Sequence, residues 1–173
     1  RHNEQSVRVV ETLEKEGQGL NLTELVRDGI LHHSKPRSGL TGHLTGQSVA
    51  IEGDVVKLAD GIAYINHDLD DSIRAGLLSV SDVPESVLTT LGTSHAARID
   101  TLVRDVIASS EVTTAPGSIR ISPPVREAAD TLRDFLFDRV YTPLNAEPNT
   151  LRAQHIVRAL FTHFAANPDD LPP

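Results

Sequence analysis

The stretch from Val55 to Asp71, VVKLADGIAYINHDLDD, is expected to form the central helix of the fold. On a helix with 100° per residue, one broad side of this stretch and its flanks is apolar. That side is formed by Ile51, Val55, Leu58, Ile62, Ile65, Leu69 and Ile73. The opposite side is polar and is formed by Asp60, Tyr64, His67 and Asp71, with Lys57 and Asp68 beside them. The polar side spans only about 100° of the circumference, so the pattern predicts a mostly buried helix from residue 50 to 75.

Two interpretations of the acidic side follow from this pattern. In the first, the helix is half exposed and its carboxylates are solvated. In the second, the carboxylates line a metal or substrate site, because a buried carboxylate needs a cation, a metal ion or a polar cavity beside it. Periodicity alone does not separate these two interpretations.

Length and composition restrict the class of protein. The chain has 173 residues, which suits one domain or a piece of one. A formal net charge of −8 and the lack of a long basic run argue against constitutive binding to nucleic acid or a membrane surface. Cysteine is absent, so disulfides and cysteine metal sites are excluded. No apolar run approaches the roughly 18 residues of a transmembrane helix, and we expect a cytoplasmic protein.

The remaining pattern predicts helices and loops, with no convincing strand of normal length. Helices are expected at 4–16, 23–33, 84–91, 95–109, 122–140 and 149–166. A loop rich in Ser, Gly, Thr and Pro is expected at 34–47, and a second loop at 113–117. A short extended piece is expected around residues 119–121.

Several local features carry expectations of their own. Asn21 or Thr23 is expected to cap the second helix, and Asp82 is a candidate cap for the helix at 84–91. A kink is allowed for at 67–71, and Pro143 is expected to end the helix at Tyr141. Arg98 and Arg104 are expected on a solvated face. The last helix is expected to make core contacts through Leu151, Val157, Leu160, Phe161 and Phe164.

Five segments resemble motifs of one known family. Residues 58–77 fit L-A-D-x-I-A-Y-x-x-H-D-x-D-D-x-x-R-A-G-L, which resembles the last metal-binding helix of the HD-superfamily deoxynucleoside triphosphate triphosphohydrolases, the dGTPase-like proteins. Residues 2–6 (HNEQS) and 22–31 (LTELVRDGIL) resemble two earlier motifs of that family. The later segments at 122–123 and 132–137 resemble its later helices, so the resemblance covers essentially the whole chain in order.

The resemblance implies which fold the chain adopts and which part of the family's enzymes it represents. The implied class is all-α, an orthogonal helical array of the HD-domain type, with residues 1–173 as a single helical unit. Residues 1–78 correspond to the end of the HD core and 79–173 to a C-terminal helical region. The family's upstream His and His-Asp metal motifs have no counterpart here. We therefore expect the C-terminal part of a longer enzyme, which holds one of four protein metal ligands and is inactive alone.

The resemblance also implies a reaction, the hydrolysis of a deoxynucleoside triphosphate, dGTP or another, to deoxynucleoside and triphosphate. A divalent ion, Mn²⁺, Mg²⁺, Fe²⁺ or Zn²⁺, assists the attack of water at the α-phosphorus. Asp60 matches the family's final metal-ligand Asp. His2 matches an active-site His near the scissile phosphate, although a terminal His in an arbitrary protein is usually a frayed surface residue.

Three further residues match positions that bind substrate in related enzymes. Tyr64 corresponds to a Tyr against sugar or phosphate, and Asp68 to a carboxylate that accepts a hydrogen bond from the deoxyribose 3′-hydroxyl. Tyr141 corresponds loosely to an aromatic that stacks on the base, and its other interpretation is a packed ring with an exposed hydroxyl. Gly61 departs from the family, because some relatives have a phosphate-binding Lys there.

Two other functions stay open on the sequence. One is a helical regulatory or interaction domain that keeps the fold without catalysis, and the other is an HD phosphohydrolase that acts on a different nucleotide. The resemblance further implies a homo-oligomer. It also leaves open nucleotide or nucleic-acid activators, although the net charge argues against constitutive nucleic-acid binding.

Overall fold

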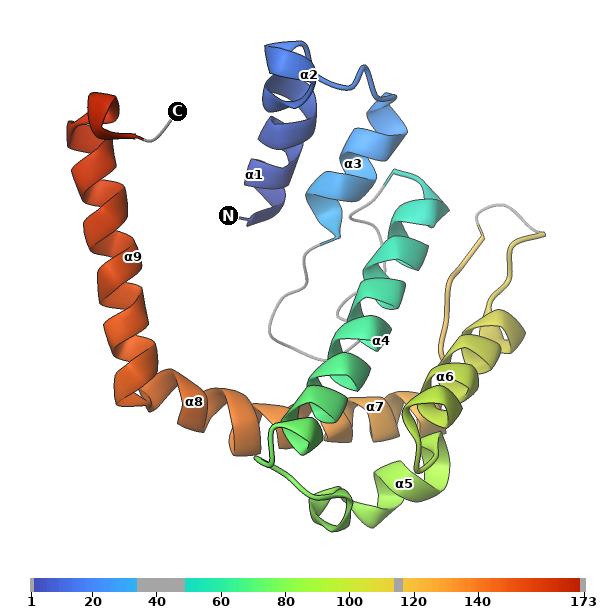
Figure 1. Cartoon of the computed structure of the whole chain (residues 1–173). Helices are drawn as coiled ribbons and strands as arrows, with labels where there is room; N and C mark the ends of the chain where they lie inside the picture. The colour runs from blue at the N-terminus through green and yellow to red at the C-terminus, as the bar shows by residue number, and fades with distance from the viewer. Residues whose placement is uncertain (1, 34–48, 114–116, 172–173) are drawn as a thin grey trace. The chain divides into compact units, whose positions relative to one another are not determined.

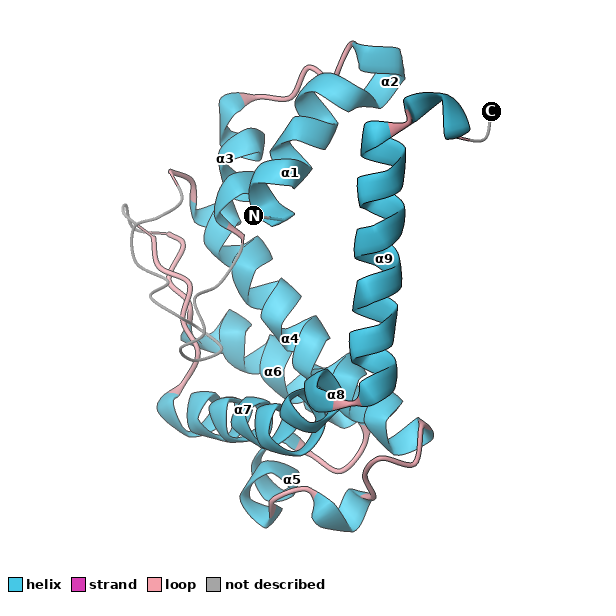
Figure 2. Cartoon of the chain, turned by 90° about the vertical axis from the view of Figure 1, so that its left-hand side faces the viewer, coloured by secondary structure: helices cyan, strands magenta, loops and turns pink. Residues whose placement is uncertain are grey.

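The computed structural model describes residues 2–33, 49–113 and 117–171. Over these residues the chain is helical with no strand, which confirms the all-α class (Figure 2). The one extended pairing among them is an isolated antiparallel bridge between Glu111 and Ser118. None of the described helices is long and apolar enough to cross a membrane. The expected loop at 34–47 lies outside the described residues.

Contacts divide the chain into two units, residues 1–134 and 135–173. The first unit contains α1 (His2–Arg8), a π-helical turn (Val9–Leu13), α2 (Glu14–Gly17), α3 (Glu24–His32), α4 (Ile51–Arg74), a 3-10 turn (Val80–Asp82), α5 (Glu85–Leu91), α6 (His95–Ser109) and most of α7 (Pro123–Leu136). The second contains a π-helical turn (Phe137–Tyr141), α8 (Thr142–Ala146), α9 (Pro148–Ala166) and a 3-10 turn (Pro168–Asp170). The predicted boundary between 78 and 79 stays a prediction.

The segment before α3 is less regular than the predicted helix at 4–16. The α-helix begins at His2, passes into the π-helical turn and loses its regular backbone at Lys15 and Glu16, which have φ values of 51° and 56°. Gly19 has φ of 72° and donates its N–H to the Glu14 carbonyl at 2.9 Å. A glycine reaches this left-handed conformation without steric cost, and the chain turns there toward α3.

Helix α3 begins where the sequence predicts. The Thr23 hydroxyl accepts a hydrogen bond from the Val26 N–H at 3.4 Å, which confirms Thr23 as the cap. Figure 1 shows α3 beside both α1 and α4, and these two pairs of helices are in contact. The Asn3 side chain donates to the Leu31 carbonyl at 2.6 Å, so the first turn of α1 is attached to the last turn of α3.

Helix α4 is the 24-residue centre of the first unit and runs from Ile51 to Arg74 without a break. The kink allowed for at 67–71 is therefore absent. Leu58 and Leu69 are 1% and 0% exposed, and Ile62 and Ile65 are buried with them. The predicted apolar side is thus confirmed along the middle of the helix.

The start of α4 differs from the prediction. Lys57, expected beside the polar side, is only 3% exposed, whereas Val55 and Val56 are 45% and 52% exposed. The covered face is therefore turned toward Lys57 and Gly61 in this part of the helix.

Burial raises the pKa of the Asp54 carboxyl, and the nearby positive charge of Lys57 acts in the opposite direction.

The α5–α6 region also corrects one cap. Asp82 does not cap α5, because its carboxylate accepts the Ser79 N–H at 2.7 Å and closes the preceding 3-10 turn. Pro84 occupies the N-cap position of α5 instead. Helix α6 spans the predicted residues and is capped by Ser94, whose hydroxyl accepts the Ala97 N–H at 3.2 Å.

The core of the first unit joins α4, α5, α6 and α7. Its completely buried apolar side chains include Leu69, Val87, Leu91, Leu102 and Leu132. The residues before α7, expected to be extended, belong to no strand, and Ile119 and Ile121 are each 8% exposed. The five completely buried side chains named above come from all four helices, so their close packing fixes how α4, α5, α6 and α7 pack together.

In the second unit, Pro143 does not stop the helix as expected. Tyr141 and Thr142 both keep right-handed helical backbone angles, and Pro143 lies in the first turn of α8. The π-helical turn before it shifts the hydrogen-bonding register from i→i−4 to i→i−5. In the first turn of a new helix the missing N–H of proline costs little.

The expected core contacts of α9 are wrong. No residue of α9 is buried: Leu151, Val157, Leu160 and Phe161 are 52–76% exposed, and Phe164 is half-buried. Within its unit α9 contacts α8 and the 3-10 turn that follows it. An apolar stripe shows which side of a helix can be covered, but it does not supply the covering surface.

Two left-handed glycines give a test of the turn before α3. A Cβ on Gly19 would overlap the carbonyl of Glu11, whereas Gly76, with φ of 70°, has no atom within 4 Å of that position. We expect Gly19→Ala to lower the free energy of unfolding by about 2–4 kcal/mol, and Gly76→Ala by about 1 kcal/mol. Urea denaturation measures both, and equal losses would contradict this packing of the turn.

Candidate functional site

Three of the predicted site residues lie along one side of α4. Asp60, Tyr64 and Asp68 are spaced four residues apart on an unbroken helix, so each step advances about 6 Å and keeps nearly the same direction. Asp60 and Tyr64 are exposed, with Tyr64 55% exposed, and Asp68 is half-buried. A ligand can therefore reach all three side chains from one side of the helix.

The C-terminal half of this row lies close to α6. The His67 ring stacks on the His95 ring with centroids 5.2 Å apart and planes inclined by 14°. His95 Nδ1 lies 3.2 Å from one carboxylate oxygen of Asp70. The first turn of α6 is thus adjacent to the turn of α4 that carries Asp68.

Arg98 joins the two helices beneath this surface. Its side chain is 3% exposed, its Nε donates to the Asn66 side-chain oxygen at 3.0 Å, and its Nη2 donates to Asp70 at 2.8 Å. Asn66 is itself 0% exposed and donates to the Ile62 carbonyl at 2.7 Å. The positive charge of Arg98 is therefore compensated by one carboxylate and one oriented amide.

The expectation that Arg98 is solvated is wrong, and the helical register contains the missed signal. Arg98 lies one turn before Leu102, which is completely buried, so both side chains face the same way. Arg104, in contrast, is exposed as expected and pairs with Asp100 at 2.7 Å. Residue type alone predicted the same environment for both arginines.

His2 lies on α1, away from the row on α4 in sequence. It is exposed at the first turn of the helix, and its ring lies edge-to-face with the His33 ring, with centroids 5.2 Å apart and planes inclined by 67°. Its ring contact is therefore with the residue that directly follows α3. Neither this contact nor the position of His2 tests its expected role at the scissile phosphate.

Tyr141 belongs to the second unit and is described within it. Its ring is half-buried and packs edge-to-face on Phe137, with centroids 4.9 Å apart. That packing agrees with an aromatic side chain that serves a structural purpose. Stacking on a base, implied by the resemblance, stays a prediction.

A complete metal site is absent from the described residues. No group of three or more His, Cys, Asp or Glu side chains in this part of the chain is arranged to hold an ion. Asp60 offers carboxylate oxygens of the kind that Mg²⁺ and Mn²⁺ prefer. One carboxylate does not make a site, so the described residues by themselves do not fit the expected ion.

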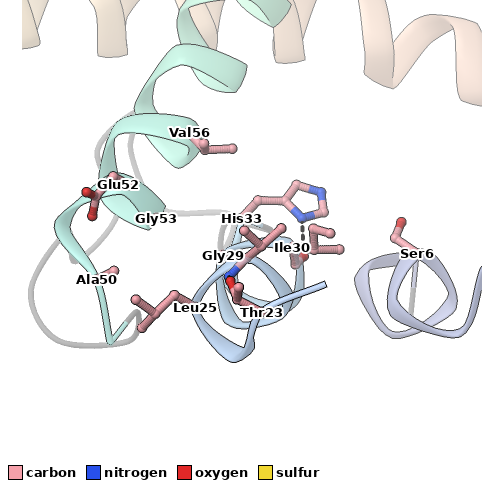
Figure 3. Close-up of a pocket in the computed structure, with 11 residues that line it drawn as sticks. Ser6, Thr23, Leu25, Gly29, Ile30, His33, Ala50, Glu52, Gly53 and Val56 are labelled. Atoms are coloured by element: carbon pink, nitrogen blue, oxygen red, sulfur yellow. Dashed lines mark hydrogen bonds between the residues drawn. The ribbon is translucent and has the colours of Figure 1, made fainter. Parts of the chain in front are cut away.

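Two cavities lie elsewhere in the first unit. A cavity of about 530 Å³ opens between α1, α3 and the start of α4 (Figure 3), and its polar lining comes from Ser6, Thr23, His33 and Glu52. A second, of about 350 Å³, lies between α4 and α6 and is lined only by apolar residues. Asp60, Tyr64 and Asp68 line neither cavity, so the row on α4 forms an open surface.

The sequence is similar to one described protein family and to several known proteins. Residues 119–173 match the family described as "Phosphohydrolase-associated domain". The chain is 45% identical over 172 residues to a deoxyguanosinetriphosphate triphosphohydrolase-like protein of Caldanaerobacter subterraneus subsp. tengcongensis, covering 99% of the chain and 47% of that relative. Proteins with the same name are 42% identical in Clostridium tetani, covering 99% and 49%, and 34% identical in Bordetella pertussis, covering 99% and 55%. The chain spans about half the length of these relatives.

The buried guanidinium gives a test of what holds α4 in place. We expect Arg98→Ala to lower the free energy of unfolding by about 2–4 kcal/mol, because Asn66 and Asp70 lose their donors and a cavity remains. Arg104→Ala removes the same side chain from the exposed face of the same helix, and its denaturation midpoint should match that of the wild type. The two midpoints decide the question, and equal midpoints would contradict the described burial of Arg98.

Proposed function

This chain is homologous over nearly its whole length to deoxyguanosinetriphosphate triphosphohydrolase-like proteins, and we propose that it forms part of a metal-dependent enzyme that hydrolyses deoxynucleoside triphosphates. The products are the deoxynucleoside and inorganic triphosphate. The observation that carries the proposal is the row of Asp60, Tyr64 and Asp68 on one unbroken helix, within a sequence 42–45% identical to proteins of that name.

The proposed reaction begins with the attack of water on the α-phosphorus. The bond from this phosphorus to the 5′-oxygen breaks, the electron pair stays on that oxygen, and a proton converts it to the hydroxyl of the deoxynucleoside. A divalent ion supplies Lewis-acid stabilisation of the phosphate oxygens when it is bound. In the proposal Asp60 would provide one oxygen ligand to that ion.

His2 has the chemistry for the proton transfers. An imidazole can donate or accept a proton near neutral pH, which suits a group next to a leaving oxygen or an attacking water. His2 is exposed at the first turn of α1, so its ring is accessible to a substrate. We assign to it the transfer of a proton at the scissile phosphate.

The middle and end of the row have the chemistry to read the sugar. The Asp68 carboxylate can accept a hydrogen bond from a 3′-hydroxyl, and Tyr64, one turn before it, is 55% exposed. Gly61 provides no side chain for a phosphate, so the triphosphate must be bound by other groups. Base stacking by Tyr141, assembly into a homo-oligomer and nucleotide effectors belong to the proposal as well.

Loss of Asp60 tests the metal-dependent reaction. In the full-length product of the gene that encodes these residues, triphosphate release is measured from each dNTP and rNTP with Mn²⁺ or Mg²⁺. Asp60→Asn should lower the rate more than about 100-fold, because loss of even an outer partner of a metal ligand costs 10–100-fold. Asp71→Asn, which changes an exposed carboxylate on the same side of α4, should keep the rate within about threefold.

Three outcomes contradict the proposal in whole or in part. If the full-length protein hydrolyses no nucleotide with either metal, the chain belongs to a non-catalytic helical domain. If a different nucleotide ester is hydrolysed instead, the reaction class holds and the substrate class is wrong. Undiminished activity of Asp60→Asn would remove this carboxylate from the metal site.

The sugar-reading role of Asp68 is tested with a substrate that lacks the 3′-hydroxyl. The wild type should prefer dGTP to dideoxy-GTP by about 10³-fold or more, because the analogue leaves a carboxylate without its donor. In Asp68→Ala the ratio of kcat/KM values should fall toward one. A ratio unchanged by the substitution would show that Asp68 does not contact the 3′-hydroxyl.

A further inference from the structure

The packing of α1 on α3 brings a second histidine against His2. The side-chain amide of Asn3 donates to the Leu31 carbonyl at 2.6 Å and joins the first turn of α1 to the last turn of α3. His33 follows that last turn directly. Its ring lies edge-to-face with the ring of His2, with centroids 5.2 Å apart.

The ring of His33 is itself held in one orientation. Its Nδ1 lies 2.6 Å from the Ile30 carbonyl oxygen, and Figure 3 shows this contact as a dashed line. A carbonyl oxygen only accepts hydrogen bonds, so Nδ1 carries the hydrogen and both the tautomer and the ring plane are fixed. His33 is half-buried, whereas His2 is exposed. The oriented ring therefore belongs to His33, and it is the surface on which the ring of His2 rests.

The neighbouring histidine is oriented differently. His32 Nδ1 lies 3.1 Å from the Asp28 carbonyl oxygen and 2.9 Å from an Asp28 carboxylate oxygen. The same Asp28 carboxylate accepts the Val49 N–H at 2.8 Å, through its other oxygen. His32 thus takes part in the packing of α3 with the residues before α4, and the contact with His2 distinguishes His33 from it.

We propose that His33 is a positioning residue for His2, and this inference rests on the proposed function of His2 in triphosphate hydrolysis. An imidazole at the exposed first turn of a helix otherwise samples several rotamers. The edge-to-face contact selects one of them and directs the same face of the His2 ring toward the substrate in every molecule. A misplacement of about 1 Å in a reacting group can cost 10²-fold in rate.

The test compares two substitutions of His33 in the full-length protein, with dGTP and Mn²⁺. His33→Ala removes the ring, and we expect kcat to fall about 10–100-fold while KM changes less than threefold. His33→Phe keeps a ring edge beside His2. If His33→Ala lowers kcat 100-fold, the kcat of His33→Phe should be at least tenfold higher than that of His33→Ala. The midpoint of thermal unfolding is measured for each variant. If His33 had a purely structural role, kcat would fall only in variants whose thermal midpoint also falls.

His32→Ala is the matched control, because it removes the imidazole that directly precedes His33, and the ring contact between His33 and His2 stays in place. Its kcat should stay within threefold of the wild type. A kcat for His33→Ala that also stays within threefold overturns the proposal. So does a His33→Phe variant as slow as His33→Ala, because the ring contact would then contribute nothing.

A second measurement does not depend on turnover. The aromatic ring of His33 shifts the NMR signals of the His2 ring protons, so His33→Ala should move these signals and His32→Ala should not. If the two variants give the same signals for the His2 ring protons, the contact between the rings of His33 and His2 is overturned. If the wild type is inactive, or if His2→Ala is as active as the wild type, the proposed function fails and the NMR comparison alone decides whether His33 orients His2.

Discussion

The buried guanidinium of Arg98 is the constraint on which the candidate site depends. A buried charge without partners costs several kcal/mol, and here an amide on one turn of α4 and a carboxylate on the next accept its hydrogen bonds. Because Asn66 and Asp70 lie four residues apart, only one rotation and one axial position of α4 satisfy both. The side of α4 that carries Asp60, Tyr64 and Asp68 is thereby fixed relative to α6.

This attachment explains how a polar row can stay ordered on an open surface. The apolar side chains of α4 supply most of the burial, but they are chemically alike and define the register of a helix only loosely. The hydrogen bonds of Arg98 are directional and add the register. The other half of the site is organised in the same way, because one amide of Asn3 attaches α1 to α3 and brings the ring of His2 to His33.

Much of the fold and of the row on α4 could be predicted from the sequence, because both depend on local periodicity. The limits of α4 and α6 and the alignment of Asp60 with Tyr64 and Asp68 follow from a 3.6-residue period. Burial was harder to predict: residue type alone suggested that Arg98 is solvated, and the apolar stripe of α9 stays exposed within its own unit. The approach of His33 to His2 depends on the packing of α1 on α3, for which a single sequence has no signal.

The most direct test of the account is the fate of solvent oxygen in the products. The full-length protein is incubated with dGTP and Mn²⁺ in ¹⁸O-labelled water, and the products are analysed by ³¹P NMR and mass spectrometry. We expect one labelled oxygen on a terminal phosphorus of inorganic triphosphate and none in deoxyguanosine. Label in orthophosphate or pyrophosphate would place the attack at a different phosphorus and contradict the assignment of this helix to a triphosphohydrolase site.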